Sequence, residues 1–167
     1  MNAITAQGMV IIHSAPRALL PHVEWAIGRL MGGPTTIKWT PQALAQGTFR
    51  TEHHWVGSVT FASKLASELL GWAALRFEII QDQAPGVDGW RLAYTPALGL
   101  FQGQMDSMGN VLLNEHRIRA MLDHEAGAAS IAEQLRIALG EPWDEELEAF
   151  RIAGAEAPVI WLRSVSS

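Results

Sequence analysis

The segment GMVIIHSAPRALLPHVEWAIGR, residues 8–29, decides the fold of this chain. It begins with an apolar run at residues 9–12, which predicts a buried strand at residues 9–13, and the polar residues after the run lead directly into a helical pattern. A buried strand that stops at a helix N-terminus brings polar side chains and backbone N–H groups together at one point. We therefore expect a helix that is capped near Ser14 and runs to residue 31, with a candidate binding point at its start.

A second unit of similar spacing follows the first. β-branched and aromatic residues predict strands at residues 35–40 and 49–56, and a strand is also expected at residues 75–81. Between the strands at residues 49–56 and 75–81 lies a half-buried amphipathic helix that is capped by Ser58 or Thr60 and ends at Gly71. This order is that of the ferredoxin-like βαββαβ plan, in which the first and third strands are central and both helices cover one face of an antiparallel sheet.

The chain is therefore predicted to be an α+β protein in two parts. Residues 1–83 form the ferredoxin-like half, and residues 84–167 add a β-hairpin and helices that pack on it as one unit. The elements expected in the second part are strands at residues 90–95, 98–105, 111–113 and 159–165 and helices at residues 114–125, 130–140 and 143–152.

Charged and apolar residues alternate along three of the predicted strands. Because successive strand residues point to opposite faces, Arg50, Glu52, His54, Arg76 and Glu78 are expected on the face of the sheet away from the two helices. Cross-strand ion pairs on a solvated face explain this pattern, and so does a platform for a polar ligand or a protein partner. The first strand is apolar on both sides, so we expect the second half or another subunit to cover part of this face.

Ser14 and Arg17 form a candidate anion site at the start of the first helix. Ser14 would cap the helix, and Arg17 would pair with an anion held by the helix N–H groups. An ordinary N-cap followed by Pro16 in the first turn explains the same residues without a ligand. The glycines of a phosphate-cradling loop are missing from this stretch.

The catalytic alternative is an enzyme with its site at the end of the first strand. In it, His13 is the general base, Glu24 or Glu52 orients that base, and Arg17 clamps an anion. No spacing pattern of a known nucleophile, nucleotide-binding loop, metal site or cofactor site is present, so the sequence predicts neither a metal nor a cofactor.

Trp25 lies on the outer face of the first predicted helix, with His22 and Arg29 at spacings of three and four. An indole in that position suggests that something covers it. Packing by the second half of the chain is the simpler prediction, and a partner surface is the alternative.

Composition excludes several classes of protein. The chain has 167 residues and a net charge of −5. It contains no cysteine, which rules out a disulfide framework and fits a reducing cytoplasm. Residues 1–82 carry a net charge of +1 and residues 83–167 carry −6, which argues against nucleic-acid binding. No apolar stretch is long enough to span a membrane.

Several segments resemble a family of actinobacterial proteins of unknown function. The resemblance covers nearly the whole chain, and HSAPRALLPHVEWAIGRLMG, FRTEHHWVG, LGWAALRFEI and GWRLAYTPALGLF carry it, the first most specifically. It implies an actinobacterial cytoplasmic protein. It implies no activity, cofactor or catalytic residue.

The function predicted from these observations is a non-enzymatic module that binds a small polar ligand or a protein partner, as an oligomer. The residues expected to bind are Ser14, Arg17, Arg50, Glu52, His54, Arg76 and Glu78. The enzyme described above and a purely structural subunit are the alternatives.

Overall fold

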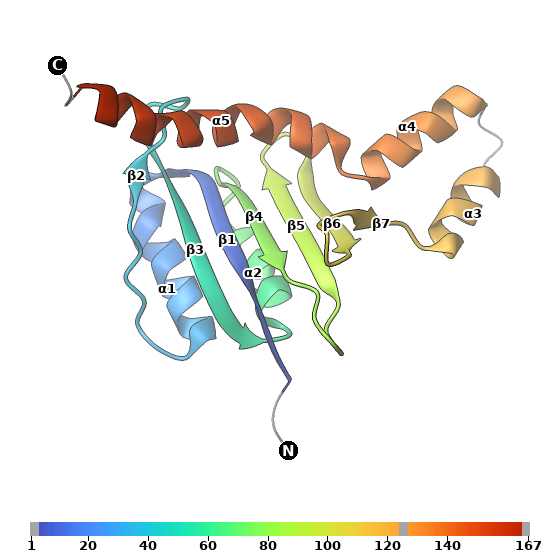
Figure 1. Ribbon diagram of the computed structural model, residues 1–167, viewed down its shortest axis with the longest axis horizontal. Helices are drawn as coiled ribbons and strands as arrows, with labels where there is room; N and C mark the ends of the chain where they lie inside the picture. Colours follow the sequence, from blue (N-terminus) through green and yellow to red (C-terminus); the bar gives the residue numbers. More distant parts are fainter. Residues whose placement is uncertain (1–3, 124–126, 165–167) are drawn as a thin grey trace.

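The computed structural model describes residues 4–123 and 127–164, with side chains described up to Ala155. The described residues form one seven-stranded antiparallel sheet in the order β2-β3-β1-β4-β5-β6-β7 (Figure 1). The strands are β1 (Thr5–Pro16), β2 (Thr40–Pro41), β3 (Thr48–Ser58), β4 (Arg76–Gln81), β5 (Gly89–Thr95), β6 (Gly99–Met105) and β7 (Val111–Leu112), and the helices are η1 (Arg17–Leu19), α1 (Leu20–Met31), α2 (Phe61–Leu69), α3 (Glu115–Asp123), α4 (Ala128–Ala138) and α5 (Glu141–Ser164).

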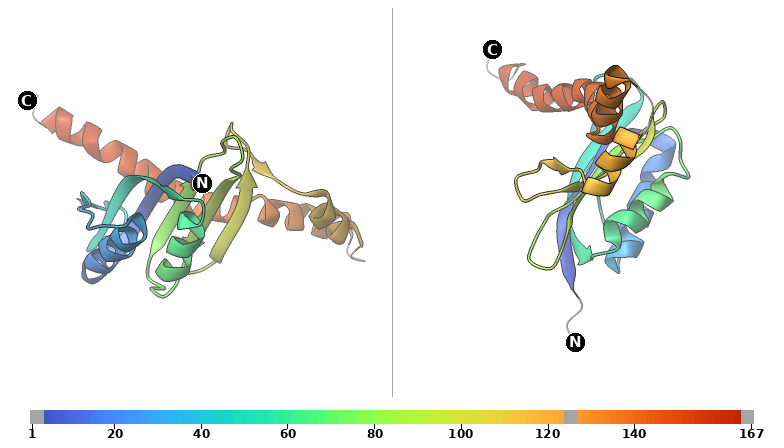
Figure 2. Two further views of the ribbon diagram at one scale, coloured as in Figure 1. Left: turned by 90° about the horizontal axis from the view of Figure 1, so that it is seen from below. Right: turned by 90° about the vertical axis from the view of Figure 1, so that its right-hand side faces the viewer.

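The first four strands confirm the ferredoxin-like plan. They lie in the order β2-β3-β1-β4, with β1 central between β3 and β4. Helices α1 and α2 cover one face of the sheet, while α5 runs along the other side (Figure 2). The strands β5, β6 and β7 continue the same sheet beyond β4, so the prediction of an α+β fold is confirmed.

Apolar side chains on alternate strand positions form the core under α1 and α2. Val10, Trp55 and Phe77 point into it from three neighbouring strands, and Ile27 and Leu65 reach it from the two helices. Apolar residues recur at every second position on the strands and at every third or fourth position on the helices. Each spacing places the apolar side chains on one face of its element, and the two faces pack together. Helix α1 then ends at Gly32, whose φ of 87° is a left-handed conformation suited to glycine.

A β-bulge interrupts β1 at His13. Ile12 pairs with Thr51 of β3 and Phe77 of β4, but the next partners are Ala15 with Phe49 and Ser14 with Arg76. One extra residue therefore lies in β1 relative to both neighbours. Ala15 consequently points into the core, and the consecutive side chains of His13 and Ser14 both contact residues on the face opposite α1 and α2.

Two predictions about the ends of elements in the first half are wrong. Ser14 does not cap a helix, because pairing with β3 extends β1 to Pro16, and α1 starts only at Leu20 after η1. The strand expected at residues 35–40 is reduced to β2. Trp39 of this segment donates a hydrogen bond from Nε1 to Glu24 of α1 at 2.8 Å, so side-chain anchoring replaces regular strand pairing there.

The helices of the second half also differ from the prediction. Helix α4 begins before Ser130, at Ala128, and the final strand expected at residues 159–165 is instead part of α5 as far as Ser164. The helix expected at residues 143–152 is likewise one section of α5. Asn114 caps α3 as expected, since its Oδ1 accepts a hydrogen bond from the Arg117 N–H at 2.8 Å. Residues 124, 125 and 165 of these predictions lie outside the described residues.

Candidate functional site

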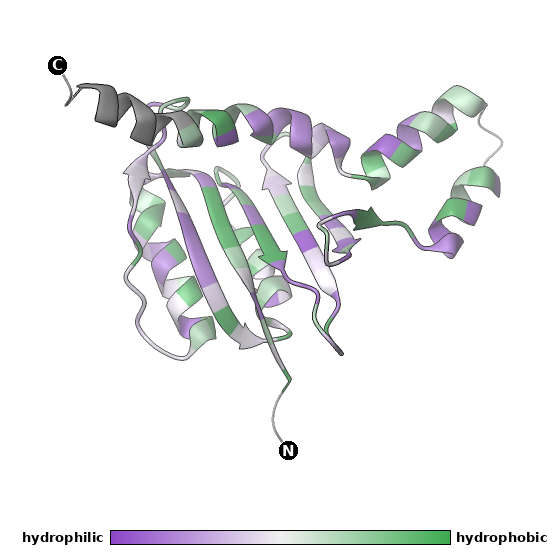
Figure 3. Cartoon of the chain, in the orientation of Figure 1, coloured by the Kyte–Doolittle hydropathy of each residue, from purple (hydrophilic) through white to green (hydrophobic). Residues whose placement is uncertain are grey.

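Helix α5 attaches to the ionic side of the sheet through a short apolar stripe. Trp143, Leu147 and Phe150 recur at helical spacing and are buried, and Trp143 also donates from Nε1 to the carbonyl oxygen of Gly99 at 2.9 Å. The stretch of α5 beside the ends of β4 and β5 is otherwise hydrophilic (Figure 3). The helix therefore brings both an apolar anchor and charged groups to the sheet.

Glu78 lies at the centre of the charged contacts under α5. It is 3% exposed, and its carboxylate accepts hydrogen bonds from His13 at 2.7 Å and from Arg91 at 2.7 and 3.0 Å. Arg151 of α5 donates to the same carboxylate at 2.7 and 3.3 Å. Both arginines also contact Asp144, at 2.7 and 3.3 Å respectively. One buried carboxylate thus joins β1, β4, β5 and α5.

These contacts fix the protonation of the central pair. Burial alone raises the pKa of Glu78, but hydrogen bonds from His13 and Arg151 and the charge of Arg91 outweigh burial and hold that pKa well below its ordinary value. Glu78 is therefore ionised, and a carboxylate can only accept hydrogen bonds. His13 must then carry a proton on Nε2, so in the neutral ring its Nδ1 has the free lone pair.

A second group of contacts lies on the same face, next to the Glu78 cluster. Arg76 donates to Glu146 of α5 at 3.3 Å and to Ser14 at 3.4 Å, and its guanidinium lies 4.8 Å from the centre of the Phe150 ring. Thr95 donates to the other oxygen of Glu146 at 2.9 Å. Charged and aromatic groups thus fix the position of α5 on this side.

A hollow of about 650 Å³ opens beside these contacts, between β1, β3 and α5. Arg50 lies across it and donates to the carbonyl oxygen of Gly154 at 3.2 Å and to Glu52 at 3.1 Å. A Cβ on Gly154 would lie 2.5 Å from the centre of this guanidinium, so glycine is what allows Arg50 to pack against α5. The hollow is lined by Ile11, His13, Lys38, Thr40, Arg50, Thr51, Glu52, Arg151, Gly154 and Ala155.

The structure brings most of the predicted site residues onto one face. Arg50 and Glu52 line the hollow, and Arg76 and Glu78 form the contacts under α5. His54 is exposed further along β3, opposite Met9, and is not among the residues that line the hollow.

The residues of the proposed helix-start site and of the catalytic alternative are more scattered. Ser14 contacts Arg76, whereas Arg17 is exposed in η1 and does not line the hollow. His13 and Glu52 do line it. Glu24 is bonded to Trp39, and Glu78 is the carboxylate that orients His13.

Sequence reasoning missed Arg91, Arg151 and Lys38. Arg91 had a signal, because a charged residue in the otherwise apolar strand at residues 90–95 continues the pattern of Arg76 and Glu78. Arg151 had none, since its role depends on where α5 lies. Lys38 belongs to the segment that was predicted to be a regular strand.

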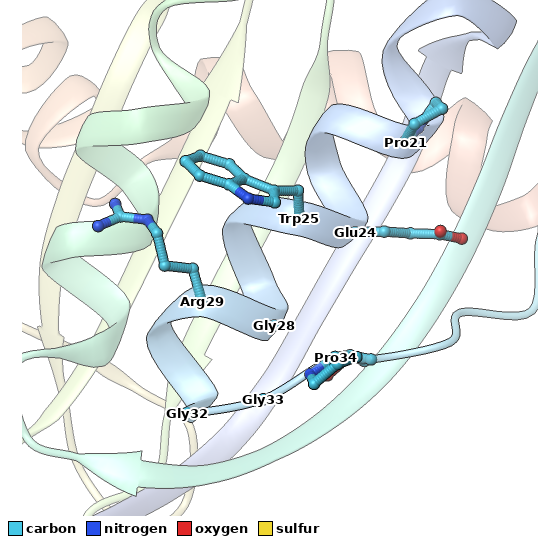
Figure 4. Close-up of a pocket in the computed structure, with 9 residues that line it drawn as sticks. Pro21, Glu24, Trp25, Gly28, Arg29, Gly32, Gly33 and Pro34 are labelled. Atoms are coloured by element: carbon cyan, nitrogen blue, oxygen red, sulfur yellow. The ribbon is translucent and has the colours of Figure 1, made fainter.

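Another hollow, of about 600 Å³, is lined by Trp25 and other residues of α1 and of the segment that follows it (Figure 4). Trp25 is 62% exposed, so the prediction that the second half of the chain covers it is wrong. The second half is on the other side because α5 crosses the opposite face of the sheet. Arg29 lies 5.1 Å from the centre of the Trp25 ring and pairs with Glu68 of α2.

Metal binding and membrane crossing find no support among the described residues. No group of three His, Asp or Glu side chains is placed to hold a metal ion there, and His53 and His54 point to opposite faces of β3. No helix in this part of the chain combines the length and apolar character needed to cross a bilayer.

Comparison with protein families gives a match over residues 9–164, to a family described as a protein of unknown function, DUF3145. The chain belongs to the DUF3145 family. The match includes β1 from residue 9 onward, the hollow and the Glu78 contacts, so the charged face of the sheet lies within the part that matches the family. No curated protein and no solved structure matches the chain.

Proposed function

We propose that this DUF3145 protein binds a small anion, a molecule with a carboxylate or phosphate group, in the hollow beside α5. The observation that carries the proposal is the set of cationic groups that line one hollow. Lys38, Arg50 and Arg151 come from three separate segments, and His13 adds an imidazole. Glu52 is the one carboxylate among the lining residues. Because the chain as a whole has a net charge of −5, this positive charge is local.

Arg50 is the residue best placed to hold the anion. Its guanidinium is fixed on one side by the Gly154 carbonyl, which leaves the planar fork that matches a carboxylate or phosphate in two-point contact. Its other partner, Glu52, has a side chain that is 56% exposed, and such a pair contributes little, so a ligand can replace it. Lys38 is exposed, lines the same hollow and supplies a second charge.

A second candidate function is proton transfer on the bound anion. It is favoured by the contact between His13 and Glu78, in which a buried carboxylate holds the ring and leaves Nδ1 as the basic nitrogen beside the hollow. In this version Arg50 binds the substrate, His13 accepts the proton, and Glu78 positions His13.

The test measures thermal unfolding of the full chain with inorganic phosphate, pyrophosphate, succinate or citrate. A bound anion raises the melting temperature as its concentration rises. We expect at least one probe to do so for the parent, and Arg50→Met to abolish the shift while its own melting temperature stays close to that of the parent. The matched control is Arg119→Met, which removes an exposed arginine on α3 and should keep the shift.

Three outcomes decide between the candidates. No shift with any probe, or equal shifts in all three proteins, overturns the binding proposal. If the probe that binds is converted to a product, as followed by NMR, and His13→Asn stops the conversion without stopping the shift, the second candidate is supported. A bound probe that stays intact supports binding alone.

A further inference from the structure

Arg50 and Glu52 lie next to each other on the wall of the hollow beside α5. They are two residues apart on β3, so their side chains leave the same face of the strand. The Nη2 atom of Arg50 and the Oε1 atom of Glu52 are 3.1 Å apart, and the Glu52 side chain is 56% exposed. A cation and an anion therefore line this hollow side by side.

The Arg50 guanidinium packs on Gly154 with its face, which leaves its edges for contacts in its own plane. A Cβ added at Gly154 would lie 2.5 Å from Cζ and 2.6 Å from both Nε and Nη2, which places it over the plane of the group. Nη1 already donates to the Gly154 carbonyl oxygen at 3.2 Å. A ligand carboxylate in two-point contact with Arg50 therefore takes the edge formed by Nε and Nη2, and Glu52 now accepts from Nη2.

A ligand at that edge changes the surroundings of Glu52. The Glu52 carboxylate loses its hydrogen bond from Arg50, and it then lies beside a second negative group, which repels it. A ligand that carries a cationic group next to its carboxylate avoids this repulsion, because the cation pairs with Glu52 while the carboxylate pairs with Arg50. An α-amino acid has this arrangement, since its carboxylate and its ammonium are attached to one carbon.

The wall of the hollow has positive charge beyond this pair. Arg151 is already bonded to carboxylates under α5, whereas Lys38 is exposed and comes from the segment that precedes β2. Once Arg50 and Glu52 are matched, Lys38 is the lining charge left for a second anionic group. The volume of about 650 Å³ lies within the usual range of small-molecule sites and has room for both ends of such a ligand.

We propose that the ligand of this hollow is an amino acid with an anionic side chain, of the class of glutamate and aspartate. The inference rests on the proposed function and names the class of anion that it binds. Arg50 binds the α-carboxylate, Glu52 binds the ammonium, and Lys38 binds the carboxylate of the ligand's side chain.

The experiment measures the affinity of the full chain for L-glutamate, glutarate and L-glutamine by titration calorimetry at pH 7 and constant ionic strength. Glutarate lacks the ammonium and carries more net negative charge, so attraction to a positive hollow alone would favour glutarate. We expect glutamate to bind about three- to fivefold more tightly than glutarate, which is the gain from one further exposed ion pair. For the same reason, we expect glutamate to bind more tightly than glutamine, whose side chain is neutral.

The outcomes separate this inference from the proposed function. Binding of glutarate or of glutamine that is as tight as that of glutamate overturns the inference and leaves anion binding in place. Absence of binding by all three also overturns it, whereas the thermal shifts with phosphate, pyrophosphate, succinate and citrate decide the proposed function separately.

Two variants with matched controls test the assigned contacts. Glu52→Gln keeps an acceptor for Arg50 but removes the charge, and it should abolish the preference for glutamate over glutarate. Glu115→Gln, which changes an exposed carboxylate of α3, should keep that preference. Lys38→Gln should abolish the preference for glutamate over glutamine, and Lys64→Gln, at an exposed lysine of α2, should keep it. A preference that survives Glu52→Gln or Lys38→Gln overturns the corresponding contact.

Discussion

The two faces of the sheet are joined to their helices by different kinds of contact. Under α1 and α2 the contact is almost wholly apolar, and Leu65, Phe77 and Ile79 are fully buried there. Under α5, apolar contacts are fewer, and Glu78 and Arg91 are buried within an ion-pair cluster that also includes Arg151. The same sheet thus packs against apolar side chains on one face and against a cluster of charged side chains on the other.

The difference shows which property each face specifies. Apolar packing depends on how well the side chains fit together, and its contribution to stability does not change with pH. A buried carboxylate instead requires each of its partners in place, because losing one leaves an uncompensated charge. We infer that the α1–α2 face supplies most of the stability of the fold, whereas the α5 face sets the position of the groups around the hollow.

The largest expected effect is that of Glu78→Gln. It leaves Arg91 and Arg151 buried or half-buried without their shared carboxylate, and it should cost about 3–5 kcal/mol of the free energy of unfolding at neutral pH. The midpoint of urea unfolding at pH 7 measures this loss. A cost no larger than that of an exposed ion pair would mean that the two faces do not differ in the way described.

The same variant has a predicted pH dependence. The pKa of Glu78 is lower in the folded protein than the ordinary value of 4.5, so the unfolded chain takes up the proton first as the pH falls. The stabilisation from this group is therefore complete above about pH 4.5 and is lost at lower pH. The difference in stability between parent and Glu78→Gln should shrink between pH 7 and acid pH, and a constant difference would contradict the assignment.

A slightly smaller effect is expected on the opposite face from Leu65→Ala. Leu65 is fully buried in α2, and truncating a buried leucine costs about 2–5 kcal/mol through lost burial and the cavity that remains. Because the contact involves no titratable group, this cost should be the same at pH 7 as at acid pH. Unfolding of both variants in parallel, over one pH series, tests the contrast directly.

The smallest effect on stability is predicted for Gly154→Ala. Alanine favours the helix by about 1 kcal/mol relative to glycine, but its Cβ displaces the Arg50 guanidinium. We expect stability to change by no more than about 1 kcal/mol, together with a clear weakening of anion binding in the thermal-shift assay. Unchanged binding would show that the position of Arg50 against α5 is not needed.

Much of the first half could be predicted because its signals are local. The apolar run at residues 9–12, the amphipathic pattern of α2 and the alternation around Glu78 each follow from neighbouring residues. Together they fix which strands are central and which face is charged. The place of Arg50 and Arg76 on that one face follows from the alternation of side chains along each strand.

The rest could not be predicted because it depends on contacts between distant residues. The apolar run after residue 158 fits a strand as well as a buried helix, and in the chain it continues α5. The hollow requires α5 to cross the sheet, and no local pattern encodes that path. The bulge at His13 was also hidden, since it depends on the registers of two neighbouring strands.

That bulge restricts how the family can vary in length. Deleting one residue between Ile12 and Ala15 would restore regular pairing. It would also remove either His13 or Ser14, whose side chains now both make contacts on the same face of the sheet. Inserting one would turn Ala15 out of the core. Homologues should therefore keep the residue count of this strand unchanged.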